Sequence, residues 1–577
     1  MTKDQVCTIL EEIALLLELK GENVFKFRAY QNAVRALELF TGDFSTLAQE
    51  GHLPKIDGIG KAIAEKITEL VQTGKLPYHE ELKAEFPPEI FDLFEIQGLG
   101  AKKIKALNDQ LGVSSIPLLE KACREKMVET LPGFGEKTQE KLLAAIELHH
   151  AHAKLARRGK VAPIAEAILE MMRTHPDVTR LSLAGSYRRA KEVLGDLDLV
   201  VSSKYPESVM NGFASLPEID SILLRGPTKM SVRLKSGIQC DLRVVSDAEY
   251  PFALNYFTGS KEHNVELRNR ALTLGWTLNE YRLASVDETK SPPCIRDETE
   301  LYQALDLAYI PPELRENTGE LEAAAQNRLP KLIEWSNLRG TFHNHTTASD
   351  GKNTLQEMVD AADELGLDYL GIADHSKSSV QANGLSEERL LNQLAEIRAL
   401  QQAGSPVRIF TGVECDILKD GSLDFADDLL SQLDYVVASV HSSFTLSEEE
   451  MTARIIRAME NRYVTMLGHL TGRILLTREP YAVNIPKLID CAAATGTWIE
   501  LNANPYRLDM DWRWWHLAKD KGVKCVINPD AHQTKGLLDL FYGVGIARKG
   551  WLTRNDVMNC LPLSEIETAL RRKRQLA

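Results

Sequence analysis

The sequence predicts a multidomain protein of the α+β and α/β classes, and three observations lead to this prediction. The chain has 577 residues, whereas a single hydrophobic core rarely grows beyond about 250–300 residues. Residues 1–154 begin with apolar side chains at the three- and four-residue spacing of helices, as at Val6, Ile9, Leu10 and Ile13. Residues 338–577 alternate apolar strands with helical stretches, which is typical of a parallel sheet or barrel. We therefore expect a helical part, a mixed central part and a C-terminal α/β domain.

Composition limits the possible functions. The net charge is −14, which excludes a uniformly basic nucleic-acid binder, so any DNA site has to be a local patch or to use backbone contacts. The eight cysteines contain no Cys-x-x-Cys pair, and we expect free thiols in a reducing cytoplasm. No signal peptide and no membrane helix is expected, because no apolar run approaches the required length.

Three Gly-apolar-Gly turns, each before a helix that carries lysines, occur in the N-terminal part. Paired glycines permit a tight turn, and the helix that follows directs free N–H groups toward a phosphate. A single copy fits a glycine cap between packed helices about equally well, but three copies favour a common function. The turns resemble helix-hairpin-helix motifs, which implies that they grip the DNA backbone without reading sequence. The glycines are Gly58 and Gly60, Gly98 and Gly100, and Gly133 and Gly135.

Lys66 lies one turn into the helix after the first of these turns. Its position resembles that of the lysine that forms a Schiff base in the lyase domain of the polymerase beta family, a reaction that requires a neutral amine. The second lysine of that family is Ala62 here. A solvated helix lysine is the favoured interpretation, by roughly two to one.

The central part is organised around residues 185–201, in which a Gly-Ser turn precedes two aspartates in an apolar run. Asp196 and Asp198 share a face of the expected strand because they are two residues apart. Paired carboxylates repel each other unless a cation lies between them, and such oxygen ligands suit Mg²⁺ together with substrate phosphates. Taken alone, the pattern fits a surface Asp-x-Asp on an edge strand with about even odds.

A third carboxylate, Asp241, lies in a later apolar run and favours the metal-site interpretation. Residues 155–318 resemble the palm and thumb of the X-family DNA polymerases, the family of DNA polymerase beta. The resemblance implies that Asp196, Asp198 and Asp241 bind Mg²⁺, with Asp241 as the candidate base for the primer 3′-hydroxyl. It further implies nucleotide or template contacts at Gly185, Ser186, Arg189, Tyr256, Phe257, Asn264 and Arg268.

Three positions in this part need separate comment. Leu194 replaces a serine that touches phosphate in the family, and Lys261 replaces an aspartate beside the base. Both departures leave phosphate binding and fidelity open. His263 stands alone, apart from any other histidine in this part, and we interpret it as a solvated or capping histidine.

In the C-terminal part, histidines and acids recur at the ends of apolar strands, where the site of a parallel α/β domain lies. Because several such residues occur together, the prior that they are merely structural histidines of the core is below about one in ten. Mixed imidazole and carboxylate ligands suit Zn²⁺ or Mn²⁺, and the set is too large for one ion. It resembles the polymerase-and-histidinol-phosphatase (PHP) domain, which implies a distorted (β/α)₇ barrel with a trinuclear metal site. The implied ligands are His343, His345, Asp350, His375, Glu414, His441, His469, Asp530 and His532.

The two resemblances, in this order, are those of bacterial and archaeal X-family polymerases with a C-terminal PHP domain. They imply six segments: a lyase-like helical domain (1–85), a helix-hairpin-helix region (86–154), a palm (155–250), a thumb (251–318), a linker that is partly helical (319–337) and a PHP phosphoesterase domain (338–577).

The resemblances imply a cytoplasmic, monomeric repair polymerase that uses dNTPs to fill short gaps on gapped or primer-template DNA. They also imply a metal-dependent 3′-5′ exonuclease, with AP endonuclease or 3′-phosphatase activity as further options of the PHP site. Two alternatives stay open: a PHP phosphatase for a small phosphomonoester with a vestigial polymerase half, and a DNA-end scaffold with idle sites. The helix-hairpin-helix turns argue against the first alternative, and the cost of unused clustered charge argues against the second.

Overall fold

The structure is a computed structural model that describes residues 1, 3–39, 44–49, 53, 58–96, 98–152, 155–287 and 291–575. It divides into two compact units, Met1–Ala153 and Lys154–Ala577. Parts of two expected Gly-apolar-Gly units, residues 55–57 and residue 97, lie outside the described residues.

The first unit is helical, as predicted, and contains two hydrophobic cores. One core joins α1, α2 and α4, with Leu10, Ile13 and Ile67 at its centre. The other joins α6, α7 and α8 around Ile104, Leu119 and Ile146. The elements are α1 (Lys3–Lys20), α2 (Val24–Leu39), α3 (Phe44–Gln49), α4 (Lys61–Thr73), α5 (Pro77–Ala84), η2 (Pro88–Glu95), α6 (Ala101–Leu111), α7 (Ile116–Arg124), η3 (Val128–Thr130) and α8 (Gly135–His152).

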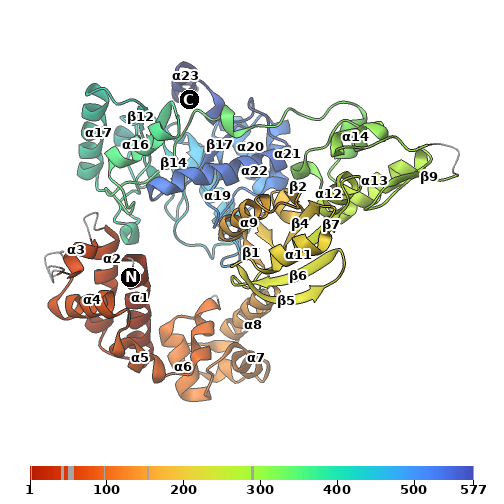
Figure 1. Ribbon diagram of the computed structural model, residues 1–577. Coiled ribbons are helices and arrows are strands. Elements are labelled where there is room, and N and C mark those ends of the chain that lie inside the picture. The colour runs from red at the N-terminus through yellow and green to blue at the C-terminus, as the bar shows by residue number, and fades with distance from the viewer. Residues whose placement is uncertain are drawn as a thin grey trace. The chain divides into compact units, whose positions relative to one another are not determined.

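The second unit opens with a five-stranded sheet of order β2-β4-β7-β6-β5 (Figure 1). Strands β4 and β7 are parallel, and the other pairs are antiparallel. A short pair, β1 with β3, lies beside it. Apolar side chains of α9 and α11 form one core with this sheet. The elements are β1 (Ala156–Arg157), α9 (Arg158–Arg173), β2 (Arg180–Leu183), α10 (Gly185–Arg188), β3 (Val193–Leu194), β4 (Asp196–Ser202), α11 (Pro206–Ala214), β5 (Ile219–Arg225), β6 (Lys229–Leu234) and β7 (Gln239–Val245).

Helices α12 and α13 follow the sheet along the chain and contribute to a smaller hydrophobic core. Leu321 and Leu332, from the stretch expected to be a partly helical linker, pack into this core, as does Trp551 from near the C-terminus. The segment 319–332 is therefore held by packing. The elements are α12 (Tyr250–Thr258), α13 (Lys261–Thr273), β8 (Trp276–Leu278), β9 (Leu283–Ser285), α14 (Glu298–Ala304), η4 (Pro312–Leu314), α15 (Glu320–Ala325) and η5 (Trp335–Asn337).

The C-terminal strands are all parallel, as the strand-helix alternation predicts. They form a three-stranded sheet, β10-β11-β12, and a five-stranded sheet, β13-β14-β15-β16-β17. Single bridges, His375 with Glu414 and Asn344 with Ala531, join the two sheets at both borders. Because β12 and β13 follow each other along the chain, the arrangement is a distorted barrel of seven strand positions within residues 340–528. The strands are β10 (Gly340–Thr341), β11 (Tyr369–Ile372), β12 (Arg408–Thr411), β13 (Glu414–Asp416), β14 (Val437–Ser439), β15 (Met466–Leu467), β16 (Trp498–Asn502) and β17 (Cys525–Asn528).

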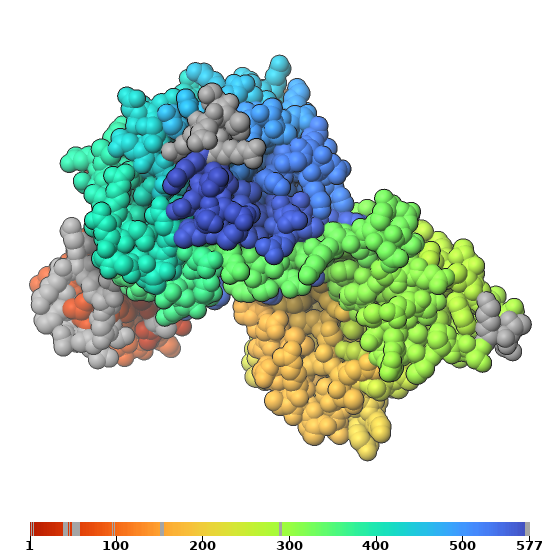
Figure 2. Space-filling model, turned by 90° about the horizontal axis from the view of Figure 1, so that it is seen from above, coloured from red at the N-terminus to blue at the C-terminus, as the bar shows by residue number. Residues whose placement is uncertain are grey.

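Helices surround this barrel, and two begin with capping boxes, at Thr354 with Glu357 and at Ser447 with Glu450. The segment after the thumb lies along the C-terminal residues, green beside dark blue in Figure 2, and the Ile333 N–H donates to the Leu552 carbonyl. In the described part of the chain, no helix is both long and apolar enough to cross a membrane. The helices are α16 (Leu355–Glu364), η6 (Val380–Ala382), α17 (Glu387–Gln402), α18 (Asp427–Leu430), α19 (Glu448–Met459), α20 (Ile485–Thr495), η7 (Trp512–Trp514), α21 (Trp515–Asp520), η8 (Thr534–Asp539), α22 (Leu540–Lys549), η9 (Met558–Cys560) and α23 (Leu563–Gln575).

Candidate active sites

The central sheet brings the three expected aspartates together. Asp198 of β4 lies directly opposite Asp241 of the parallel strand β7. Asp196 precedes Asp198 by two residues on the same strand and so shares its face. The expected carboxylate cluster is therefore present at the start of two central strands.

The three carboxyls do not titrate alike. Burial, followed by the charges of Asp196 and Asp241, raises the pKa of Asp198 to about 7. Burial would also raise the pKa of Asp241, but hydrogen bonds from Lys229, Gln239 and Ser231 more than offset it, so that pKa is lowered. The Lys229 Nζ lies 2.8 Å from Asp241 Oδ2. Such an acidic cluster is disfavoured without a cation, and its oxygen donors fit Mg²⁺.

Gly185 lies against this cluster. The expected Gly-Ser turn is the first turn of α10, and Gly185 has a φ of +56°. A Cβ at Gly185 would lie 2.0 Å from Asp198 Oδ2. The Ala184 N–H donates to the Asp198 carbonyl at 2.8 Å. Only glycine permits this contact between the turn and the aspartate.

The expected nucleotide contacts extend from this turn into α12 and α13. Arg189 Nε lies 3.1 Å from Glu316 Oε1, and its Nη1 donates to the Thr258 carbonyl. Ser186, the second residue of α10, is half-buried.

The remaining expected contacts lie where α12 ends and α13 begins. The Tyr256 and Phe257 rings pack edge to face with centroids 5.1 Å apart. Asn264 Nδ2 donates to the Tyr256 carbonyl at 2.7 Å, and Arg268 Nε donates to the Asn264 carbonyl at 3.2 Å. Helices α12 and α13 thus carry these four residues, and hydrogen bonds link Tyr256, Asn264 and Arg268.

The interpretation of His263 as a solvated or capping side chain is wrong. The ring is fully buried. His263 Nδ1 lies 2.7 Å from Glu320 Oε1, and Nε2 lies 2.9 Å from the Tyr302 hydroxyl. Both partners are distant in sequence, so the local pattern did not reveal them.

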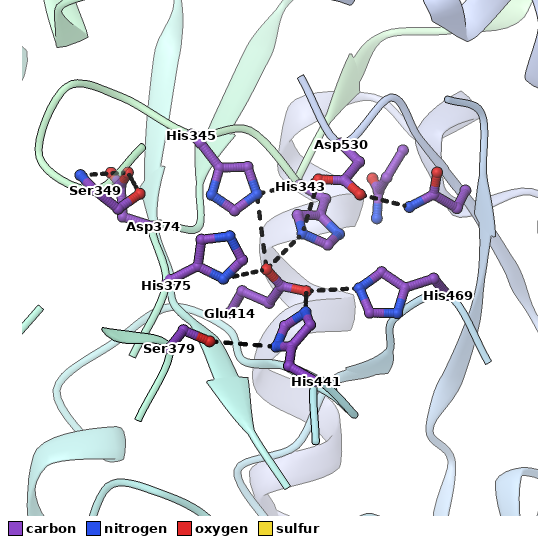
Figure 3. A network of polar contacts seen from close by, with 12 residues as sticks. His343, His345, Ser349, Asp374, His375, Ser379, Glu414, His441, His469 and Asp530 are labelled. Atoms are coloured by element: carbon purple, nitrogen blue, oxygen red, sulfur yellow. Dashed lines mark hydrogen bonds and ion pairs between the residues drawn. The ribbon is translucent and has the colours of Figure 1, made fainter. Parts of the chain in front are cut away.

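The barrel carries a second cluster, with Glu414 at its centre (Figure 3). Glu414 Oε1 lies 2.9 Å from His469 Nε2 and 3.3 Å from His441 Nε2. Its Oε2 lies 2.9 Å from His375 Nδ1 and 3.3 Å from His343 Nε2. Burial alone would raise the pKa of Glu414, but the surrounding imidazoles lower it well below its usual value. The cluster therefore centres on a buried carboxylate.

The ligand atoms of this cluster fall into three overlapping groups, each with its atoms within 4.8 Å of one another. Within the described residues, several buried atoms of the cluster make no hydrogen bond of acceptable geometry, although some of them lie close to each other, and this is costly unless another group binds them. Donor type, spacing and these atoms all fit metal ions. The atoms without such a hydrogen bond are His343 Nε2, His345 Nδ1, His375 Nδ1, Glu414 Oε2 and His469 Nδ1. The three groups are His345, Asp350, His375 and His532; His343, His345 and Asp530; and His375, Glu414 and His441.

Three side chains around this cluster escaped the sequence analysis. Glu500 Oε2 lies 2.7 Å from His343 Nδ1, and Asp416 Oδ1 lies 2.7 Å from His441 Nδ1. Both carboxylates hold an imidazole with its other nitrogen facing the cluster, as is typical around metal sites. Arg507 Nε lies 3.6 Å from Asp530 Oδ2, and its buried Nη1 has no hydrogen-bond partner in the part of the chain that the structure describes. Glu500 follows the strand-end pattern and could have been included; Asp416 and Arg507 depend on tertiary contacts.

The N-terminal unit contains the expected glycine turns. The first glycines, Gly58 and Gly98, have φ of +91°, and Gly133 and Gly135 are also in the left-handed region. Gly60 and Gly100 are the N-cap residues of α4 and α6, and no side chain caps either helix at this position. Lys66 is half-buried in α4, with its Nζ 4.8 Å from the centre of the Tyr78 ring.

Four family models match the chain, and they correspond to these parts. A helix-hairpin-helix domain matches residues 1–76, and a SAM-like helix-hairpin-helix tandem matches residues 90–147. The DNA polymerase beta thumb matches residues 253–316, and the PHP domain matches residues 341–504.

Known proteins resemble the whole chain or its C-terminal part. The chain is 38% identical over 574 residues to the DNA polymerase/3′-5′ exonuclease PolX of Bacillus subtilis, covering 99% of this chain and 100% of that protein. It is 27% identical to a protein named a probable phosphatase from Thermoanaerobacter sp. (strain X514), covering 40% of this chain and 94% of that protein. A similarly named protein of Acetivibrio thermocellus is 29% identical over 33% of this chain and 78% of its own length.

Proposed function

The chain belongs to the PolX family of DNA polymerase/3′-5′ exonucleases, and from this premise we propose that its two clusters of ligand residues carry the two activities separately. The aspartates of the central sheet would serve nucleotide addition, and the histidine-rich cluster of the barrel would serve 3′-end hydrolysis. Two chemically different donor sets in separate parts of one unit support this division: oxygen-only in the sheet, and mixed nitrogen and oxygen in the barrel.

For nucleotide addition, the register pair of Asp198 and Asp241 is the observation that carries the proposal. Asp196, Asp198 and Asp241 would hold Mg²⁺, which neutralises developing charge on the phosphates during in-line transfer. The lowered pKa of Asp241 keeps it ionised, so it can accept the proton of the primer 3′-hydroxyl.

The nucleotide would lie between the α10 turn and the surface formed by α12 and α13. Gly185 and Ser186 would offer backbone and hydroxyl groups to the triphosphate, and Arg189 would supply charge. Tyr256 and Phe257 would lie against the sugar, while Asn264 and Arg268 would face the nascent pair and the template. These assignments rest on position in the motif.

For hydrolysis, the three ligand groups would hold three ions of Mn²⁺ or Zn²⁺ type, and such ions make a water molecule nucleophilic near neutral pH. His343, His345, Asp350, His375, Glu414, His441, His469, Asp530 and His532 are the proposed ligands. Arg507 has a buried N–H without a partner beside Asp530, and it is placed to bind a phosphate oxygen.

The helix-hairpin-helix turns would hold the DNA backbone, and the substrate would be gapped or primer-template DNA with a short gap, as in base excision repair. Lys66 remains a candidate Schiff-base lysine, supported only by its place in the motif. The cysteines form no disulfide among the described residues, and we propose that the protein acts in a reducing cytoplasm. A monomer remains our proposal for the functional form.

A pair of variants separates the two sites. Asp198→Ala should abolish primer extension and leave 3′-end degradation, whereas His343→Ala with His345→Ala should lose bound metal and 3′-end degradation but still extend primers. Loss of both activities in either variant would refute the division into independent sites. Hydrolysis of a small phosphomonoester, with neither activity on DNA, would instead favour the phosphatase alternative.

A further inference from the structure

Helix α22 of the C-terminal part inserts a buried lysine between the palm and the thumb. It packs on η4 and ends at Lys549, which is 1% exposed. Lys549 Nζ donates to the Arg189 carbonyl at 3.0 Å and to the Glu313 carbonyl at 3.4 Å, and it lies 2.5 Å from Glu316 Oε1. One ammonium group thus links three elements: the end of the nucleotide turn, the end of the thumb and the C-terminal helix.

Glu316 is the carboxylate at the centre of these contacts. Its side chain is 9% exposed, and it also receives Arg189 Nε at 3.1 Å and Lys191 Nζ at 3.4 Å. Burial raises the pKa of Asp198, and the charge of Arg189 offsets part of this rise, so this group of charges is close enough to act on the palm carboxylates. An unneutralised carboxylate at this place would repel a triphosphate and hold the arginine to itself.

The contacts of Arg189 leave one edge of its guanidinium available. Nε faces Glu316, and Nη1 donates to the Thr258 carbonyl. In the described residues, Nη2 has no protein hydrogen-bond partner. The guanidinium is therefore oriented by two groups and retains donors for a phosphate, which it binds well in this planar arrangement.

We propose that Lys549 is a positioning residue for nucleotide binding: it neutralises Glu316 and fixes the Arg189 carbonyl, so that Arg189 presents its free edge to the triphosphate. The C-terminal part thereby completes the nucleotide site of the polymerase part. This inference rests on the proposed role of Arg189.

The test uses the full chain, with the KM for dNTP and kcat measured in single-nucleotide primer extension. Lys549→Met should raise the KM about tenfold, as expected for one lost charge-assisted contact, with kcat changed less than about twofold. Lys549→Arg should restore most of the affinity. Degradation of a single-stranded oligonucleotide, measured without dNTP, should stay unchanged.

Arg548→Met is the matched control, because Arg548 joins the same interface through Glu313 Oε1 at 2.7 Å and the Ile333 carbonyl at 2.9 Å without touching Glu316. If Arg548→Met raises the KM as much as Lys549→Met, general loosening of the interface explains the effect and the proposal is wrong. An unchanged KM in Lys549→Met overturns it directly.

A second variant covers misfolding and separates the two levels of inference. If Lys549→Met unfolds the protein, Glu316→Gln in the same chain should recover both folding and nucleotide affinity, because it removes the buried charge that has lost one of its three cations; no recovery rejects the proposal. Arg189→Met tests the underlying assignment. An unchanged KM in Arg189→Met refutes the role of Arg189, whereas a raised KM there with a normal Lys549→Met refutes only the role of Lys549.

Discussion

Replacing Gly185 with alanine tests how closely the palm turn is packed on Asp198. The added Cβ would lie 2.0 Å from Asp198 Oδ2, whereas real Cβ atoms essentially never come within 3.0 Å of a neighbour. The carboxylate or the turn therefore has to shift by about 1 Å, and misplacement on this scale costs on the order of 100-fold in rate. That factor corresponds to about 2.7 kcal/mol of activation free energy. The φ of +56° adds about 1–2 kcal/mol of backbone strain for a residue with a Cβ.

The assay is the rate of single-nucleotide addition at saturating dNTP and Mg²⁺, with 3′-end degradation measured separately in the same preparation. Gly195→Ala is the control, because among the described residues its Cβ would meet only Leu155 Cδ2, at 3.8 Å. We expect Gly185→Ala to lose about 100-fold in kcat while degradation is retained and Gly195→Ala stays near the parent. Primer extension by Gly185→Ala at the parent's rate would show that Asp198 is not held in a catalytic position.

Three further predictions concern the metal ligands, pH and DNA binding. Glu500→Gln should weaken metal binding at the barrel site about 10–100-fold, because His343 loses its orienting carboxylate; metal content after dialysis measures this, and full retention would contradict it. The pKa of Asp198 is raised from 3.8 to about 7, so the folded palm holds a proton that the unfolded chain releases near its ordinary value; without metal, stability should rise as the pH falls from 7 toward that ordinary value. Mg²⁺ affinity should accordingly fall about tenfold from pH 8 to pH 6. The measurement is a Mg²⁺ titration at each pH, with Asp198→Asn as the comparison that has no titrating group at this position. An affinity of the parent that does not change with pH would count against a protonated Asp198. Gly60→Val with Gly100→Val should preserve the fold, since no atom of the described residues lies within 4 Å of either added Cβ, but should weaken salt-sensitive DNA binding; unchanged affinity would argue against phosphate contacts at these turns.

Periodic features of the chain were predictable from sequence, because alternation and helical spacing are local properties. The shared face of Asp196 and Asp198 follows from a two-residue spacing, and the parallel barrel follows from repeated strand ends. The register that pairs Asp198 with Asp241 was not predictable, since strand pairing depends on the whole sheet.

Contacts between distant segments account for the remaining errors and omissions. The burial of His263 depends on Glu320 and Tyr302, and neither is within reach of a local pattern. Lys229 is bound to Asp241 across two neighbouring strands, which sets the ionisation of that carboxylate. Arg507 becomes part of the second site only through the turn that brings it to Asp530.

The presence of Trp551 in the thumb core has a consequence for biosynthesis. The ribosome synthesises the chain from the N-terminus to the C-terminus, so N-terminal domains generally fold first. The core that contains Leu321 and Leu332 is complete only when Trp551 has been synthesised. Likewise, Glu316 can form its ion pair with Lys549 only at that stage. The polymerase part thus reaches its final packing only after nearly the entire second enzyme has been translated. A chain truncated before this point would carry a palm and thumb with an exposed apolar surface, because Leu321 and Leu332 would lack their contact with Trp551.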